Sequence, residues 1–189
     1  MKILLILSVV LSLFIIISAC STAPAKRDLP ALKTVSQVDI TRYLGEWHEI
    51  ARYPNRFQKG CRASTARYSL LKNGEIEVVN SCRNEQDGSI RQARGRAWVV
   101  DTTSNARLKV SFFWPFRGDY WIIELGSNYE YAVIGTPDRN YFWILSRSPQ
   151  MSDELYAQIL QRAEQQGFLP ARVIRSTTIT PDNQLPAPH

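Results

Sequence analysis

Short runs in which apolar and polar residues alternate fill most of the chain between residues 47 and 147. In the clearest run, Leu108, Val110 and Phe112 are separated by Lys109 and Ser111. A period of two is typical of a β-strand that buries one face. Eight such runs predict strands at residues 47–53, 63–71, 75–83, 90–100, 107–113, 119–125, 129–135 and 141–147.

The links between these runs are short and rich in turn residues. Asn73-Gly74 is a strong hairpin signal, because both residue types tolerate positive φ. No helical pattern separates consecutive strands, which argues against a parallel sheet. Eight strands can close into a barrel that has no free edge and holds one small ligand. We therefore predict an all-β fold, an eight-stranded up-and-down antiparallel β-barrel, with a two-sheet sandwich as the alternative.

One helix is predicted after the strands. Ser152 can cap its first turn and Gly167 can end it. Between them an apolar stripe repeats every four residues, at Leu155, Ile159 and Ala163. We expect this C-terminal α-helix to pack on the outside of the barrel, and residues 173–179 are a candidate for one more strand.

The N-terminus has the features of an export signal. Lys2 precedes an apolar run from Ile3 to Ile17, about 15 residues that are too few for a comfortable membrane span. Ile17-Ser18-Ala19-Cys20 resembles a bacterial lipobox, in which the cysteine is acylated and becomes the first residue. Because Ser21 stands where an inner-membrane retention signal has aspartate, the resemblance implies anchoring at the bacterial outer membrane, facing the periplasm. An ordinary secretory signal that ends near a cysteine is the alternative.

These features divide the chain into four parts. Residues 1–19 are a predicted signal peptide, and residues 20–36 are the acylated cysteine with a flexible tether. Residues 37–180 are the predicted folded domain, and residues 181–189, with three prolines, are a predicted disordered tail.

The chain is basic, with a formal net charge of +6. Arg91, Arg94 and Arg96 lie close together on one predicted strand. They would favour anionic lipid headgroups, or they form an ordinary solvated strand face. Export from the cytoplasm argues against nucleic acid as a partner.

Two cysteines remain once Cys20 is acylated. In an oxidising compartment Cys61 and Cys82 are expected to form a disulfide. A turn at Asn73-Gly74 would place Cys82 opposite about Thr65, so a bulge or a curled strand end must close the gap. Two reduced cysteines are the alternative.

Gly45-Glu46-Trp47 opens the first predicted strand. Asp39 can cap a short helical turn before it, and Gly45 lets the chain reverse. In an eight-stranded meander, the first strand starts at the end where the last strand finishes. Trp47 and Arg147 are therefore expected to meet, with the guanidinium stacked on the indole and capping carbonyls of the turn. This pair would close one end of the barrel.

A period of two also predicts which side chains face the interior. Trp47 places Glu49 and Ala51 on the inner face of the first strand. The inward residues that follow from Arg147 and from the run at 107–113 are Leu145, Trp143, Tyr141, Leu108, Val110 and Phe112.

From about Asp39 to Arg175 the sequence resembles the lipocalin family, in particular its bacterial outer-membrane lipoproteins and apolipoprotein D. Gly45-x-Trp47 matches the first family motif, and Arg147 after Ile144-Leu145-Ser146 matches the third. Asn128-Tyr129-Glu130-Tyr131 matches the second only loosely.

The resemblance implies a cup for a lipophilic ligand. By similarity to apolipoprotein D, Tyr68, Asn80, Tyr120 and Trp143 would line it. With Phe112 and Tyr141 they make six predicted ligand contacts, and plain barrel core is the alternative for each. Loops of the open end carry Phe57, Trp114 and Phe116, which would touch lipid or a second subunit, so a homodimer is also predicted.

The function expected from this resemblance is non-catalytic, without cofactor or metal. The protein would store or transport a fatty acid or lysophospholipid in its cavity, held at the membrane by its N-terminal lipid anchor. An enzyme on the same fold is one alternative, with Cys82 as the thiol candidate. A structural envelope lipoprotein with a filled core is the other.

Overall fold

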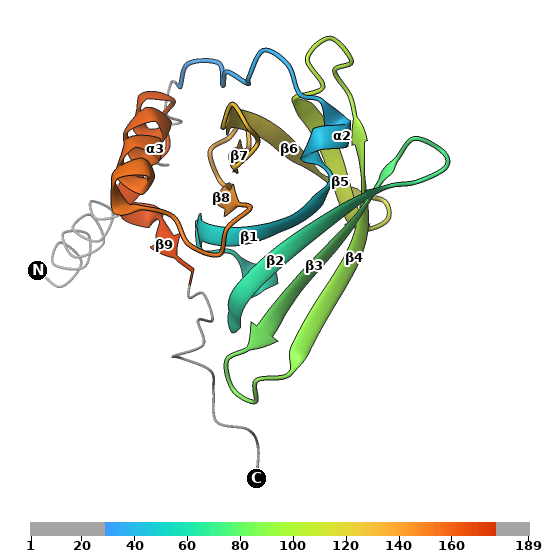
Figure 1. The fold of residues 1–189 in the computed structure, drawn as a ribbon, viewed down its shortest axis with the longest axis vertical. Coiled ribbons are helices and arrows are strands. Elements are labelled where there is room, and N and C mark those ends of the chain that lie inside the picture. The colour runs from blue at the N-terminus through green and yellow to red at the C-terminus, as the bar shows by residue number, and fades with distance from the viewer. Residues whose placement is uncertain (1–28, 177–189) are drawn as a thin grey trace, which may run out of the picture.

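The computed structural model describes residues 29–176, and the predicted signal peptide, Cys20 and the tail 181–189 lie outside them. Antiparallel strands pair in chain order from β2 to β8, and β1 pairs with both β2 and β8. The sheet therefore closes, and the predicted eight-stranded β-barrel is confirmed (Figure 1). Its strands are β1 Gly45–Arg52, β2 Cys61–Leu70, β3 Ile76–Asn84, β4 Ile90–Val99, β5 Arg107–Phe113, β6 Phe116–Leu125, β7 Tyr131–Gly135 and β8 Phe142–Ser146.

The connections alternate between the two ends of the barrel. Those between β1 and β2, β3 and β4, β5 and β6, and β7 and β8 belong to one end, which we call the mouth. The start of β1 and the end of β8 belong to the other, closed end, where the short helix α2, Ile40–Tyr43, lies (Figure 1). β6 starts at Phe116, before the predicted residue 119, because the chain turns tightly at Trp114-Pro115.

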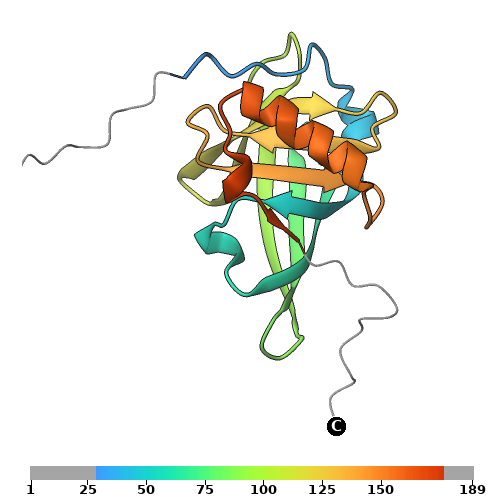
Figure 2. The same cartoon turned by 90° about the vertical axis from the view of Figure 1, so that its left-hand side faces the viewer.

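The helix α3, Asp153–Gln165, lies against the outside of the barrel, as predicted (Figure 2). The Ser152 side chain accepts a hydrogen bond from the Leu155 amide at 3.3 Å, and Gly167 follows the helix with φ of +88°. Ile159 and Ala163 are buried in an outer core with Phe142 and Ile144 of β8. None of the helices between residues 29 and 176 is long and apolar enough to cross a membrane.

Three short elements complete the described chain. The 3₁₀ helix η1, Arg56–Gln58, lies in the β1–β2 connection, and η2, Pro170–Arg172, follows α3. Within the predicted strand at 173–179, of which residues 177–179 lie outside the described chain, Ile174–Arg175 form β9 and pair antiparallel with Ala51 and Arg52 of β1.

Residues 29–38 form an N-terminal strap that packs on the barrel. Leu32 and Val38 are buried, and the Val35 amide donates to the Ile122 carbonyl at 3.1 Å. The strap begins beside the β7–β8 connection, where Arg139 donates to the Pro30 carbonyl, and it ends at α2 (Figure 2). The prediction of a flexible tether is therefore wrong for residues 29–36, because the apolar side chains of this segment find partners on the barrel.

Candidate ligand-binding site

The closed end is held together by Arg147, directly after β8. Its guanidinium carbon lies 3.8 Å from the centroid of the Trp47 ring. Its Nη2 donates to the carbonyl oxygens of Arg42 and Leu44, each at 2.8 Å, and its Nη1 donates to that of Glu46 at 2.8 Å. The predicted contact between Trp47 and Arg147 is thus present, and the guanidinium also caps the turn before β1.

Local sequence explains the geometry of that turn. The Asp39 carboxylate accepts hydrogen bonds from the Thr41 amide at 2.8 Å and the Arg42 amide at 3.3 Å, so α2 is capped as predicted. Gly45 has φ of +95°, and a Cβ at this position would lie 3.3 Å from Nη1 of Arg147. Glycine therefore meets two needs here, a left-handed backbone and room for the guanidinium.

The loosely matching second motif lies at the same end. The Tyr129 hydroxyl accepts a hydrogen bond from the Asp39 amide at 2.8 Å, and its ring lies under the guanidinium of Arg42 at 4.1 Å. The Arg147 amide donates to the Glu130 carbonyl at 2.9 Å. All three motif segments thus meet at the closed end.

Three tyrosines form the floor above this closed end. The Tyr120 hydroxyl lies 2.7 Å from that of Tyr43 and 2.9 Å from that of Tyr68. Burial raises the pKa of Tyr68 to about 12, and it raises the pKa of Tyr43 and of Tyr120 well above the usual range. Two predicted ligand contacts, Tyr68 and Tyr120, are therefore neutral members of a hydrogen-bonded cluster that fills the bottom of the barrel.

A ladder of aromatic rings leads inward from the mouth. Phe57 of η1 stacks on Tyr141 with ring centroids 6.0 Å apart, and Tyr141 stacks on Trp143 at 5.8 Å with an interplanar angle of 5°. Phe57 is 59% exposed, whereas Tyr141 and Trp143 are half-buried. We call these three rings the aromatic ladder. It contains two predicted ligand contacts, Tyr141 and Trp143.

A bulge in β1 changes the predicted facing of that strand. Glu49 pairs with Leu145 of the inner core, but Ala51 pairs with Ile144 of the outer core, because the register shifts between Glu49 and Ala51. The prediction that Ala51 faces inward is therefore wrong. The extra residue turns Arg52, opposite Trp143, toward the interior instead.

Buried polar side chains surround the inner end of the ladder. Glu49 accepts a hydrogen bond from Arg52 Nη1 at 3.1 Å and a further one from the Gln58 side chain. The Trp143 indole donates to Gln58 Oε1 at 3.0 Å. Sequence reasoning missed Arg52 and Gln58, although a glutamate and an arginine three residues apart in a strand of buried residues are a usable signal for an internal ion pair.

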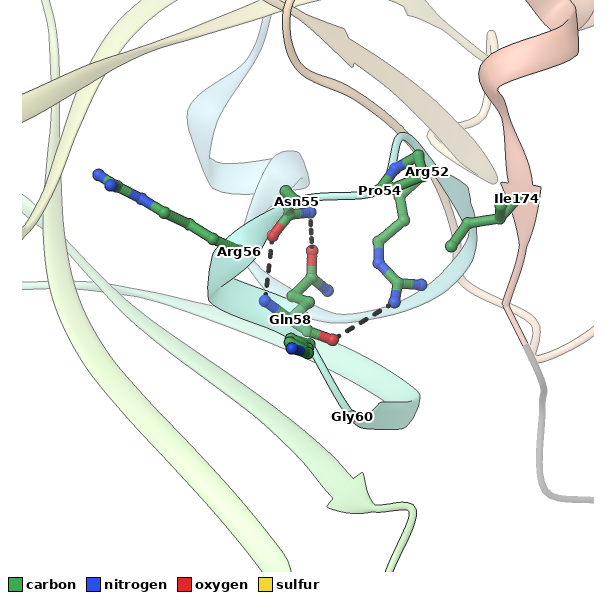
Figure 3. Close-up of a pocket in the computed structure, with 8 residues that line it drawn as sticks. Arg52, Pro54, Asn55, Arg56, Gln58, Gly60 and Ile174 are labelled. Carbon is green, nitrogen blue, oxygen red and sulfur yellow. Dashed lines mark hydrogen bonds between the residues drawn. The ribbon is translucent and has the colours of Figure 1, made fainter.

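A pocket of about 370 Å³ opens between the β1–β2 connection and β9 (Figure 3). Its lining residues are Arg52, Pro54, Asn55, Arg56, Gln58, Lys59, Gly60 and Ile174. None of the six predicted ligand contacts is among them. The pocket adjoins the aromatic ladder through Gln58, which touches Trp143 on its other side.

The remaining two predicted contacts lie on the wall toward β3 and β5. Asn80 pairs with Ala66 of the inner core, yet its side chain is exposed, so this part of the inner wall is open to solvent. Phe112 is half-buried against the inner core, and its ring lies over Gly95, where a Cβ would approach it to 2.8 Å.

Cys61 and Cys82 are bridged, with Cα atoms 5.5 Å apart. The predicted disulfide is confirmed, and the expected irregularity is a register shift between Arg62 and Thr65, where Ala63 has φ of +47°. The bridge joins the start of β2 to β3 at the mouth. Neither thiol is free in this form, including that of Cys82.

The exposed apolar residues at the mouth are large. Trp114 is 74% exposed and Phe116 is 77% exposed, and Phe113 beside them is 76% exposed. The three arginines of β4 behave differently from one another. Arg94 and Arg96 pair with Glu77 and Glu75, whereas Arg91 donates to the Lys59 carbonyl at 3.0 Å.

Comparison with known proteins identifies the family. A sequence model described as a lipocalin-like domain matches residues 38–178. The chain is a lipocalin. It is 40% identical to the outer membrane lipoprotein Blc of Citrobacter freundii over 168 residues, covering 89% of this chain and 93% of the relative. The location at the bacterial outer membrane that the N-terminus predicts agrees with the name of this relative.

More distant lipocalins resemble the chain as well. Temperature-induced lipocalin-1 of Arabidopsis thaliana is 38% identical over 147 residues, which is 72% of this chain and 77% of the plant protein. Insecticyanin of the tobacco hornworm Manduca sexta is only 20% identical, yet its solved structure superposes with a TM-score of 0.65 and covers 82% of this chain and 87% of its own. The latter match shows the shared fold.

Proposed function

We propose that this lipocalin holds the acyl chain of a fatty acid or lysophospholipid while acylated Cys20 anchors it in the outer membrane. The aromatic ladder of Phe57, Tyr141 and Trp143 is the observation that carries the proposal. Stacked rings form a continuous apolar track from solvent to the interior, which suits an unbranched hydrocarbon. The hydrogen-bonded tyrosines limit how deep the chain reaches.

The first test is to purify the full-length lipidated protein from envelopes and to identify co-purified lipid by extraction and mass spectrometry. Non-covalent fatty acid or lysophospholipid at about one molecule per protein supports the proposal. A protein that carries no lipid and takes up none when oleate is added contradicts it, and then the structural lipoprotein is the better account.

The ladder itself is tested by replacing Trp143 with Leu. We expect roughly tenfold weaker oleate binding, measured by displacement of a fluorescent fatty acid, because a stacked ring is worth about 1 kcal/mol and the Gln58 contact is lost as well. Trp98→Leu is the matched control, since Trp98 follows the inward Ala97 and so faces outward from β4. Equal affinities of the two variants would contradict a role of the ladder.

The proposal assigns no catalytic step. The thiol named for the enzyme alternative, Cys82, is held in the disulfide with Cys61. Titration of free thiols in the mature protein discriminates, because a bridged protein gives none from this pair. A free, titratable Cys82 would favour the enzyme hypothesis.

The exposed aromatics at the mouth are proposed to guide lipid from the bilayer into the barrel. Replacing Trp114 and Phe116 together with serine should slow lipid uptake from vesicles severalfold, while oleate affinity at equilibrium stays unchanged. Leu70→Ser is a control on an exposed apolar residue away from the mouth connections. Uptake as fast as in the unmodified protein would rule out this role.

A further inference from the structure

The pocket beside the β1–β2 connection is strongly basic. Three of its lining residues carry positive charge, namely Arg52, Arg56 and Lys59, and no lining residue is acidic. Arg56 and Lys59 are exposed, and neither forms an ion pair among residues 29–176. The Arg56 side chain extends away from Arg52 and Ile174, and its guanidinium carbon lies 5.1 Å from the centroid of the Phe57 ring (Figure 3). Arg56 therefore adds positive charge at the edge of the pocket, beside Lys59, without a counter-ion from the described chain.

Arg52 at the back of this pocket is only 8% exposed and still has an unused donor. Its Nη1 binds Glu49 and its Nη2 approaches the Gln58 carbonyl at 3.5 Å, but its Nε has no hydrogen-bond partner in the described structure. A buried donor without an acceptor is rare and destabilising. An anionic oxygen reaching the guanidinium would remove that destabilisation.

The Glu49 carboxylate does not take the place of the anion beside Arg52 Nε. Its carboxylate already accepts hydrogen bonds from Arg52, Gln58 and Ser176. The charge of Arg52 offsets that of Glu49, so the two exposed cations remain as the net charge of the pocket.

Gln58 connects the pocket to the aromatic ladder. Its backbone carbonyl lies at the pocket beside Arg52 (Figure 3). Its side chain accepts the Trp143 indole hydrogen at 3.0 Å. A molecule with an apolar chain along the ladder can therefore place a polar end at the cations. An anion is the polar group that such a set of donors recognises.

We infer that this basic pocket binds the anionic end of the lipid, a carboxylate or a phosphate, while the aromatic ladder binds its chain. The inference rests on the proposed lipid-binding function and adds to it the residues that bind the headgroup. Arg52 contributes a buried donor, and Arg56 and Lys59 supply the attraction that draws an anion into the pocket.

The test replaces the two exposed cations, Arg56→Gln and Lys59→Gln together, because loss of Arg52 would leave Glu49 buried without its partner and risk misfolding. Three probes are compared by displacement of a fluorescent lipid: oleate, oleyl alcohol and oleoyl lysophosphatidate. The matched control is the double variant Arg67→Gln and Lys72→Gln, which changes the net charge equally at two exposed positions that do not line the pocket.

We expect the pocket variant to bind oleate or lysophosphatidate about tenfold more weakly and oleyl alcohol as before, with the control unchanged. Loss for oleate indicates a carboxylate ligand, and loss confined to lysophosphatidate indicates a phosphate. Equal affinities for all probes in the variant and the unmodified protein overturn the inference but leave the lipid-binding proposal standing. If the unmodified protein binds none of the probes, the proposed function itself fails.

Discussion

At the scale of single residues, Arg147 is the side chain on which the closed end depends. It stacks on Trp47 and donates hydrogen bonds to carbonyl oxygens of the turn that leads into β1. Partial burial lowers its pKa from the usual arginine range, a range so high that the group stays charged at neutral pH. A planar fork with several donors suits this task, and lysine, with one compact ammonium, does not.

Arg147→Lys is therefore expected to lower the free energy of unfolding by about 1–3 kcal/mol, although the charge is kept. Urea denaturation followed by tryptophan fluorescence measures the change. Arg117→Lys is the matched control, because Arg117 also lies over an indole, that of Trp114 at 5.1 Å, but on an exposed part of the mouth. Equal losses in the two variants would show that the carbonyl contacts of Arg147 do not matter.

Ionisation of Tyr68 is expected to lower the stability of the barrel at alkaline pH. Its pKa is about 12 in the folded protein and about 10 in an unfolded chain. Above pH 10 the unfolded state loses this proton first, so stability is complete below pH 10 and falls as the pH rises toward 12. Urea midpoints between pH 8 and 11 should decline less steeply in Tyr68→Phe. An identical slope in both proteins would contradict the assignment.

At the scale of elements, most strands and α3 were predictable because each has a sequence period that matches its burial. The β1 bulge was not, since the run Glu49-Ile50-Ala51 contains no sign of an extra residue. The tyrosine floor could not be predicted either, because Tyr43 precedes the barrel strands and reaches Tyr120 only through tertiary packing. Tyr141 and Trp143 of the aromatic ladder were therefore foreseen, whereas Arg52 and Gln58 beside them were missed.

The disulfide cross-links two elements, because it joins β2 to β3 next to the β1–β2 connection. Replacing Cys61 and Cys82 together with serine should lower the free energy of unfolding by roughly 3 kcal/mol, as expected for removing a cross-link over a sequence separation of 21. Reductant should destabilise the unmodified protein by a similar amount and leave the double variant unaffected. A double variant with an unchanged urea midpoint would show that the bridge adds nothing to stability.

At the scale of the whole molecule, the strap decides where the barrel sits relative to its proposed anchor. The strap starts next to Arg139, in the β7–β8 connection at the mouth. Eight residues lie between Cys20 and Leu29, so the two Cα atoms are nine steps apart and at most about 30 Å apart when this chain is fully extended. An acylated Cys20 would therefore keep the mouth, rather than the closed end, near the bilayer.

A flexible insertion of about 20 residues between Cys20 and Leu29 should for this reason slow the transfer of a fluorescent fatty acid from the host membrane to the lipidated protein severalfold. Affinity for oleate in solution should not change. The same insertion after residue 180 is the control. Transfer rates that are equal in the two insertion variants would contradict a mouth held at the membrane.

The route of the strap also determines how the molecule responds to a mechanical force on the segment between Cys20 and Leu29. Traction from the membrane would reach the contact of Arg139 with the Pro30 carbonyl before it reaches the Val35 amide on Ile122. Contacts that bear the force one after another break at a lower force than contacts that bear it together. Release of residues 29–34 would lengthen the tether by about 20 Å. Asp39, α2 and the contacts of Arg147 with the turn before β1 would stay in place. The tether can thus lengthen under load while the barrel stays folded.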